Sequence, residues 1–307
     1  MDRVPGEWLM ALVAVLWGSA FPVTRILLEE MPPLGAAAWR TLLAATAVAL
    51  VMGVRGELRR ARPVPGQRIR LSTMAVLGGA VFLIGMNIGV ALTGAAITAF
   101  VVGMYPILAL AVATVVLGEP LARRTVAGLA VTTMGVVLLA RPGGAHVELL
   151  GVLVALGAAF SFAVYLVLAR RWADPVRLPP LSIALALLLS SMLVSSAGQL
   201  IVHPGGLQLD LTLVGWAALL WLAIPASALP HVLVVTTMRR LPASRAAPFL
   251  MLMPISGAVI AAVLLNERLD PLQLAGAGLI LAGIGAATLP GRVRIAAALE
   301  PGPEPGP

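Results

Sequence analysis

Cysteine and lysine are both missing from the 307 residues of this chain, and charged residues make up only 11% of it. Without cysteine, a disulfide framework, a thiolate metal site and a thiol nucleophile are excluded. A soluble globular chain is about 45–50% apolar and about 25% charged, whereas this chain is 60% hydrophobic with a mean hydropathy of +1.01. The composition therefore excludes an ordinary soluble protein and favours lipid as the solvent.

The signatures of intramembrane and soluble enzymes are missing as well. The sequence contains no H-E-x-x-H and no G-x-S-x-G motif, and no pair of aspartates lies within an apolar run. We therefore expect no catalytic residue, no metal and no cofactor, and the chain is not predicted to be an enzyme. An intramembrane enzyme, a channel and a scaffold are the alternatives that an experiment has to separate from a carrier.

What the sequence does contain is a series of long apolar runs. A helix needs about 20 mostly apolar residues to cross a bilayer, and continuous runs of this length suit helices and not barrel strands. The sequence predicts an all-α integral membrane protein with ten transmembrane helices. Their expected ranges are 8–28, 34–54, 71–92, 96–117, 124–140, 151–169, 179–202, 211–237, 244–265 and 271–289.

The basic residues, all 21 of them arginine, indicate the orientation of these spans. If the N-terminus is cytoplasmic, only Arg141 and Arg268 fall in outer loops, while Arg25 and Arg40 lie within spans. This bias follows the positive-inside rule and predicts a multi-pass protein of the plasma membrane (a bacterial inner membrane) with both termini cytoplasmic. Because the arginines lie between apolar runs, no nucleic acid is expected. The remaining 17, all on the inner side, are Arg3, Arg55, Arg59, Arg60, Arg62, Arg68, Arg70, Arg123, Arg124, Arg170, Arg171, Arg177, Arg239, Arg240, Arg245, Arg292 and Arg294.

An internal repeat is visible at a shift of 148 residues. The segments "MYPILALAVATVVLGEPLARRTVAGLAVTTMGVVL" and "LMPISGAVIAAVLLNERLDPLQLAGAGLILAGIGA" align without a gap. Each copy holds five spans, and five is odd, so the second copy enters the membrane inverted, as in many transporters. We expect two such repeats, 1–141 and 142–291, and a disordered tail, 292–307. The aligned pairs are Pro106 with Pro254, Glu119 with Glu267, Gly128 with Gly276 and Gly135 with Gly283.

Several motifs resemble the EamA branch of the drug/metabolite transporter superfamily. They are "WGSAFPVTR" in the first span, "LGEPL" after the fourth, "LRRLPASRAAP" before the ninth, and "LNERLDPLQLAGAGLILAGIG" leading into the tenth. The resemblance covers nearly the whole chain. It implies two inverted five-helix repeats around a central cavity, in an ATP-independent secondary transporter that moves small organic metabolites, amino acids or drug-like amphiphiles. Most members of the family export such solutes and some import them, so export is the expected direction and import stays the alternative.

The chain departs from the pattern of this family at three positions. Arg25 stands where lysine is more frequent, His231 where tyrosine is frequent, and Met253 where glutamate is frequent. The last change removes a membrane-buried carboxylate that could carry a proton, so both facilitated diffusion and proton exchange stay open.

Polar and aromatic side chains inside the spans are the candidates for substrate contact, because polar groups in a membrane are costly and often functional. Serine and threonine also bond to their own helix, so a purely structural role stays open for them. Three prolines are expected to kink helices that take part in gating. The cavity candidates are Trp17, Ser19, Phe21, Asn87, Tyr105, Tyr165, His231, Met253 and Ser256, and the kink candidates are Pro22, Pro106 and Pro254.

His231 is the only histidine within a span, and Pro230 before it offers it a backbone partner. Structure, substrate contact and proton relay are all open to it. If it relays protons, His231→Ala alters the pH dependence of transport.

Four charged residues are expected to be mainly structural. Arg25 lies near the outer end of the first span, where it snorkels or contacts an anion or outer gate. Arg40 lies about two turns inside the second span and needs a partner, for which Glu29, Glu30 and backbone carbonyls are the candidates.

Glu119 and Glu267 end the fourth and ninth spans, and we expect them to cap the helices that follow, with a gate latch as the alternative. The expected partners of the protein are a small-molecule substrate and the lipid bilayer, with a homodimer left open.

Overall fold

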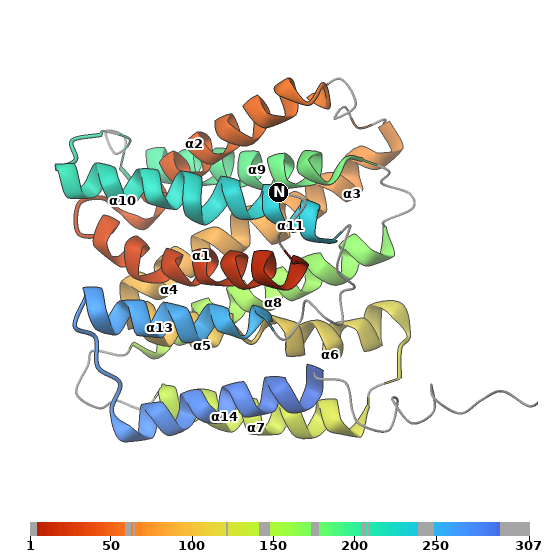
Figure 1. The fold of residues 1–307 in the computed structure, drawn as a ribbon, viewed down its shortest axis with the longest axis vertical. Helices are drawn as coiled ribbons and strands as arrows, with labels where there is room; N and C mark the ends of the chain where they lie inside the picture. The colour runs from red at the N-terminus through yellow and green to blue at the C-terminus, as the bar shows by residue number, and fades with distance from the viewer. Residues whose placement is uncertain are drawn as a thin grey trace, which may run out of the picture.

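The computed structural model describes residues 5–58, 63, 65–120, 122–140, 148–172, 178–203, 207, 209–238 and 249–288. Every regular element within these ranges is a helix, and the helices run roughly side by side (Figure 1). The α-helices are α1 Gly6–Leu27, α2 Pro33–Val54, α3 Pro65–Ala75, α4 Phe82–Thr93, α5 Ala95–Val102, α6 Tyr105–Leu117, α7 Arg123–Leu139, α8 Leu149–Arg171, α9 Pro180–Val202, α10 Leu213–Ala223, α11 Leu229–Met238, α13 Leu252–Leu264 and α14 Pro271–Thr288.

The ten predicted spans correspond to these helices. Eight helical stretches are long and apolar enough to cross a membrane, and α13 is a shorter apolar helix. The third span is longer than predicted, because its helix begins at Gly66 and runs to Thr93. The first part of the predicted ninth span, up to residue 248, and the predicted tail, 292–307, lie outside the described residues.

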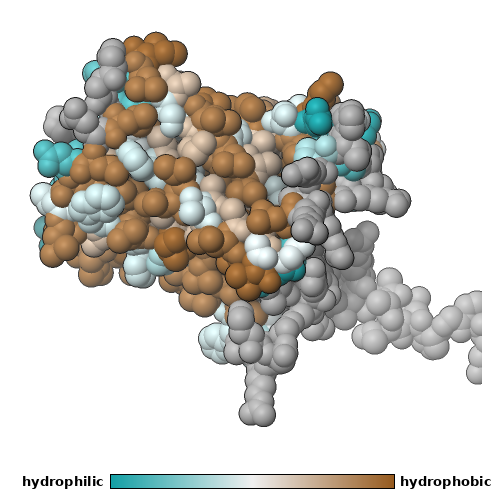
Figure 2. Space-filling view, turned by 90° about the horizontal axis from the view of Figure 1, so that it is seen from above, coloured by the Kyte–Doolittle hydropathy of each residue, from teal (hydrophilic) through white to brown (hydrophobic). Residues whose placement is uncertain are grey.

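The surface of the bundle is apolar between its two ends. Figure 2 shows one face covered by hydrophobic residues, with hydrophilic ones gathered toward opposite ends. Large apolar side chains such as Val54, Val115 and Leu213 are at least 87% exposed. Water-soluble monomers rarely expose apolar area on this scale, so the chain is a multi-pass membrane protein.

Two spans contain a π-helical turn at matching places. The turn η2, Val76–Val81, joins α3 to α4, and η3, Ile224–Ala228, joins α10 to α11. Their first residues are 148 positions apart, which is the shift of the sequence repeat. π-turns are rare and are found mostly at functional sites. Neither turn was predicted from the sequence.

The fourth and ninth spans are interrupted, and the prolines lie just after the interruptions. A turn at Gly103 separates α5 from α6, and Met251, 148 residues later, forms the turn before α13. Pro106 and Pro254 lie in the first turn of the helix that follows, a position where proline is well tolerated. Each proline therefore accompanies a break in its span, at matching places in the two halves, and the part of both prolines in gating stays a prediction. Pro22 does lie inside one unbroken helix, α1.

The two halves contact each other through equivalent helices that run in opposite directions. At the lower edge of Figure 1, α7 packs along α14. Gly128 lies against Gly283 and Gly135 against Gly276, so one helix rises as the other descends. The pair α2 and α9, the second spans of the two halves, packs in the same antiparallel way, with Gly198 against Leu34. The predicted fold, ten helices as two inverted five-helix repeats, agrees with this packing.

Candidate functional site

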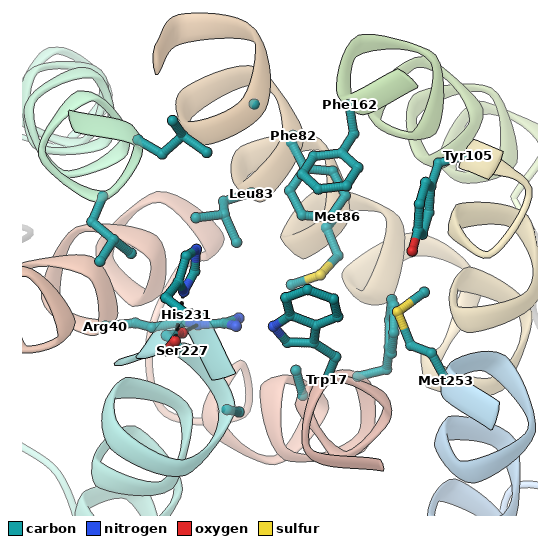
Figure 3. Close-up of a pocket in the computed structure, with 16 residues that line it drawn as sticks. Trp17, Arg40, Phe82, Leu83, Met86, Tyr105, Phe162, Ser227, His231 and Met253 are labelled. Carbon is teal, nitrogen blue, oxygen red and sulfur yellow. Dashed lines mark hydrogen bonds between the residues drawn. The ribbon is translucent and has the colours of Figure 1, made fainter. Parts of the chain in front are cut away.

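A cavity of about 80 Å³ lies inside the bundle, between helices of both halves (Figure 3). A space of this size holds several water molecules, since one needs about 10–15 Å³ on this measure. Both π-turns and α13 contribute to the cavity wall. Its lining residues are Trp17, Ala20, Phe21, Arg40, Gly78, Phe82, Leu83, Met86, Tyr105, Phe162, Leu187, Leu188, Ala226, Ser227, His231 and Met253.

Arg40 forms the charged part of the cavity wall. Pro33 occupies the first turn of α2, where its fixed φ favours the start of a helix. Arg40 follows about two turns later, where it is only 4% exposed. Its Nε donates a hydrogen bond of 2.9 Å to the Ser227 hydroxyl in η3. A charge at the centre of a membrane costs at least about 2.5–3.5 kcal/mol, and one neutral hydroxyl offsets little of that.

The partners predicted for Arg40 are therefore wrong. Glu30 instead accepts hydrogen bonds from the backbone N–H of Thr212, at 2.7 Å, and from the Thr212 hydroxyl, at 2.5 Å. These bonds hold the pKa of Glu30 below its usual value, with the Thr212 hydroxyl as the largest cause. Glu30 is thus committed to the start of α10, outside the membrane-spanning part, and does not reach the cavity wall.

His231 lies beside Arg40 on the same wall. Its Nδ1 is 2.6 Å from the carbonyl oxygen of Ser227, four residues earlier. Because a carbonyl only accepts hydrogen bonds, Nδ1 carries the proton, and Nε2 is left as an acceptor in the neutral ring. Trp17 meets the imidazole edge-on, with ring centroids 6.5 Å apart. The backbone partner expected near Pro230 is therefore the Ser227 carbonyl.

Aromatic side chains form the opposite wall. The ring centroid of Phe162 lies 4.5 Å from that of Phe82, 5.1 Å from that of Tyr105 and 5.3 Å from that of Tyr165. Figure 3 shows Phe82, Phe162 and Tyr105 across the cavity from Arg40 and His231. The cavity thus has one cationic, hydrogen-bonding wall and one aromatic wall, which suits an amphiphilic solute.

Of the nine predicted cavity residues, five line the cavity: Trp17, Phe21, Tyr105, His231 and Met253. The other four are occupied elsewhere. Ser19 donates to the Leu16 carbonyl and accepts from the Trp221 indole, and Asn87 donates to the Pro33 carbonyl at the start of α2.

Ser256 and Tyr165 are used in helix packing. The Ser256 hydroxyl donates to the Met253 carbonyl and sits where a Cβ on Gly18 would lie, which seals the crossing of α1 and α13. The Tyr165 ring covers Gly78 so closely that a Cβ there would lie 2.5 Å from it.

Sequence reasoning missed part of the lining. Arg40 was assigned a structural role, and Ser227 was not singled out as a cavity residue. The apolar lining residues Leu83, Leu187 and Leu188 carry no signal that separates them from lipid-facing leucines. The two π-turns bring Gly78 and Ser227 to the cavity. Because the turns begin 148 residues apart, the repeat in the sequence is the signal that could have linked them.

The other charged residues that the sequence singled out, Arg25, Glu119 and Glu267, lie away from the cavity. Arg25 donates from Nη1 to the Ala91 carbonyl, at 3.1 Å. Glu267 accepts from the backbone N–H groups of Ala95 and Ala96, at 3.1 and 3.0 Å. It therefore caps α5, where a carboxylate is favoured by the helix dipole.

The prediction that Glu267 caps the following helix is therefore wrong. That helix, α14, begins with a reciprocal pair, in which Asp270 Oδ1 accepts from Gln273 N–H and Gln273 Oε1 accepts from Asp270 N–H. Glu119 likewise does not cap α7, which has no side-chain cap bond. It pairs with Arg170, at 2.6 Å.

The comparison with known proteins agrees with this architecture. The EamA-like transporter family matches the chain twice, over residues 4–141 and 149–289. A probable amino-acid metabolite efflux pump of Salmonella typhimurium is 32% identical over 303 residues, which cover 92% of this chain and 94% of the relative. A probable terminal-alkyne amino-acid exporter of Streptantibioticus cattleyicolor is 27% identical over 293 residues, covering 90% and 91%. A crystal structure matches in fold, with a TM-score of 0.66 and 19% identity over 96% of this chain and 99% of the other. The chain belongs to the EamA-like transporter family.

Proposed function

We propose that the protein exports small organic metabolites, amino acids and amino-acid-like amphiphiles among them, as an ATP-independent secondary transporter. The observation that supports this most is the intramembrane cavity, whose cationic and aromatic walls face each other between helices of both halves. Two relatives, a probable amino-acid metabolite efflux pump and a probable terminal-alkyne amino-acid exporter, point to the same class of solute and the same direction.

The mechanism that fits the architecture is alternating access. Residues 1–141 and 142–291 act as two inverted repeats, in the inner membrane of a bacterium, with both termini cytoplasmic. Exchanging the conformations of two equivalent but inverted halves turns an inward-open cavity into an outward-open one. The matching π-turns, η2 and η3, and the matching interruptions at Gly103 and Met251 are the joints that such an exchange would use.

Counterflow in proteoliposomes tests this function. Vesicles loaded with unlabelled L-valine are diluted into labelled L-valine, and a carrier accumulates label transiently above its equilibrium level. A channel only dissipates the gradient, a scaffold does neither, and an enzyme converts the compound. Absence of a transient for every member of an amino-acid panel would reject the transport function.

Proton coupling is tested separately at His231. If its Nε2 receives a proton during the cycle, His231→Ala flattens the dependence of counterflow on pH between about 5 and 8, the range in which histidine titrates. Among the described lining residues, the other charged side chain is Arg40, which keeps its charge over that range. An unchanged profile in a folded variant removes the relay role from His231.

A further inference from the structure

We propose that Arg40, together with the indole N–H of Trp17, binds the carboxylate of the transported solute. This assignment rests on the proposed function, because it names the chemical group that the same cavity would recognise.

Most hydrogen-bond donors of the Arg40 guanidinium are unused by the described residues. A guanidinium carries five N–H donors in a planar fork and never loses its charge in proteins. Within the described part of the chain, only Nε has a partner, the Ser227 hydroxyl. Nη1 is fully buried without any hydrogen bond. The terminal nitrogens thus present the fork that pairs with a carboxylate through two parallel bonds.

No described carboxylate balances the positive charge of Arg40. Among the described residues, the only ion pair within 4.0 Å joins Glu119 to Arg170. The described carboxylates all lie in connections or in the first turn of a helix, so none reaches the Arg40 side chain. A buried cation without a protein partner is costly, and an anionic solute supplies the missing charge while it is bound. These carboxylates belong to Glu7, Glu29, Glu30, Glu57, Glu119, Glu148, Asp210, Glu267 and Asp270.

The indole N–H of Trp17 points toward the same space as the Arg40 guanidinium. Figure 3 shows its indole nitrogen on the side of the ring that faces the Arg40 guanidinium. The indole N–H groups of Trp39 and Trp221 donate to the Leu207 carbonyl and to the Ser19 hydroxyl. That of Trp17, whose partly buried ring lines the cavity, donates to no described residue. It is a second donor aimed at the space where the carboxylate would lie.

The rest of the cavity fits the remainder of an amino acid. Nε2 of His231 is an acceptor in the neutral ring, which suits an ammonium group beside the carboxylate. The Phe82, Phe162 and Tyr105 rings suit an apolar side chain.

Three matched ligands test the assignment on the full-length protein in nanodiscs. L-valine and 3-methylbutanoate both carry the carboxylate, whereas L-valinamide replaces it by a neutral amide of nearly the same shape. Charge-assisted hydrogen bonds are about twice as strong as neutral ones. We expect the Kd measured by calorimetry to be at least about tenfold higher for the amide than for either carboxylate. Equal Kd values for L-valine and L-valinamide would overturn the assignment.

Variants of Arg40 test whether this residue causes the preference for the carboxylate over the amide. Arg40→Gln should reduce the valinamide-to-valine ratio of Kd values to about twofold or less, whereas Arg40→Lys should keep part of it because the charge remains. Arg25→Gln, the same change at an arginine outside the cavity, should leave the ratio intact. If Arg40→Gln does not fold, Trp17→Phe decides, because it keeps most of the ring and removes only the N–H donor. It should weaken valine binding more than valinamide binding, since a bond to a charged carboxylate is stronger than one to a neutral amide oxygen. A ratio that persists unchanged in Arg40→Gln, or in Trp17→Phe where Arg40→Gln does not fold, contradicts the assignment.

The same ligands separate this assignment from the proposed function. Binding that favours carboxylates, without any valine counterflow, rejects transport and leaves the carboxylate site standing. Equal counterflow of L-valine and L-valinamide rejects the carboxylate site and leaves transport standing.

Discussion

Gly128 in α7 lies directly against Gly283 in α14: a Cβ added to either would lie 2.6 Å from the carbonyl oxygen of the other. One full helical heptad along, Gly135 and Gly276 repeat the same contact at the same distance, in the opposite order. Small residues allow helix backbones to approach closely in lipid, where packing and not water expulsion holds helices together. The pair α7–α14 therefore depends on these glycines.

The first prediction concerns this crossing. Gly283→Ala should lower the free energy of unfolding by about 1–3 kcal/mol, because the methyl group meets the Thr132 hydroxyl and, behind it, backbone of α7 that cannot move aside. Gly278→Ala on the same helix is the matched control, since its Cβ would meet nothing within 4 Å. It should stabilise slightly or have no effect, because alanine favours a helix more than glycine does. Thermal unfolding in detergent measures both, and equal melting temperatures for the two variants would contradict the crossing.

The second prediction concerns the cap at the start of α5. Glu267→Ala leaves the backbone N–H groups of Ala95 and Ala96 without their acceptor and should cost about 1–2 kcal/mol. Glu119→Ala occupies the equivalent repeat position but removes only a surface ion pair with Arg170, whose side chain is 67% exposed. Such pairs contribute about 0–1 kcal/mol. Equal losses of stability in the two variants would show that Glu267 is not the cap.

Sequence reasoning located the helices well because apolar length and arginine position are strong signals in a membrane chain. All ten spans correspond to helices, and the repeat at a shift of 148 residues reappears in the matching π-turns and interruptions. The interior of the cavity was harder. Ser19, Asn87 and Ser256 are polar residues within spans, yet each bonds to a helix backbone and none lines the cavity.

Arg40 shows why the rest could not be read from the sequence. A buried arginine requires a partner, and Glu30, ten residues earlier, is the obvious candidate along the chain. The actual partner, Ser227, is 187 residues away and reaches Arg40 from a π-turn that periodicity does not reveal. Long-range contacts of this kind depend on how the two halves pack, and helical periodicity carries no information about it.

The third prediction concerns pH. Because hydrogen bonds from Thr212 hold the pKa of Glu30 below 4.5, the ionised form is stabilised in the folded state. This contribution is fully present above the unfolded pKa and is lost as the pH falls through the lower folded pKa. The melting temperature of the wild type should therefore exceed that of Glu30→Gln by a constant margin from pH 7 to about 5. The margin should shrink below about pH 4.5. A margin that grows on acidification would mean that folding raises the pKa of Glu30, which contradicts a hydrogen-bonded carboxylate.

The fourth prediction concerns the aromatic wall. Phe162 lies between Phe82 and Tyr105, so Phe162→Ala should enlarge the cavity on the side away from Arg40. Bulky solutes such as L-phenylalanine should then compete better for L-valine counterflow, by about 3- to 10-fold, while L-valine itself binds more weakly because it loses apolar contact. Phe160→Ala, two residues away on the same helix, is the matched control, because Phe160 is 52% exposed and does not line the cavity. If both variants change the competition equally, the wall does not set the size of the solute. If only Phe162→Ala changes it, the solute side chain lies against these rings.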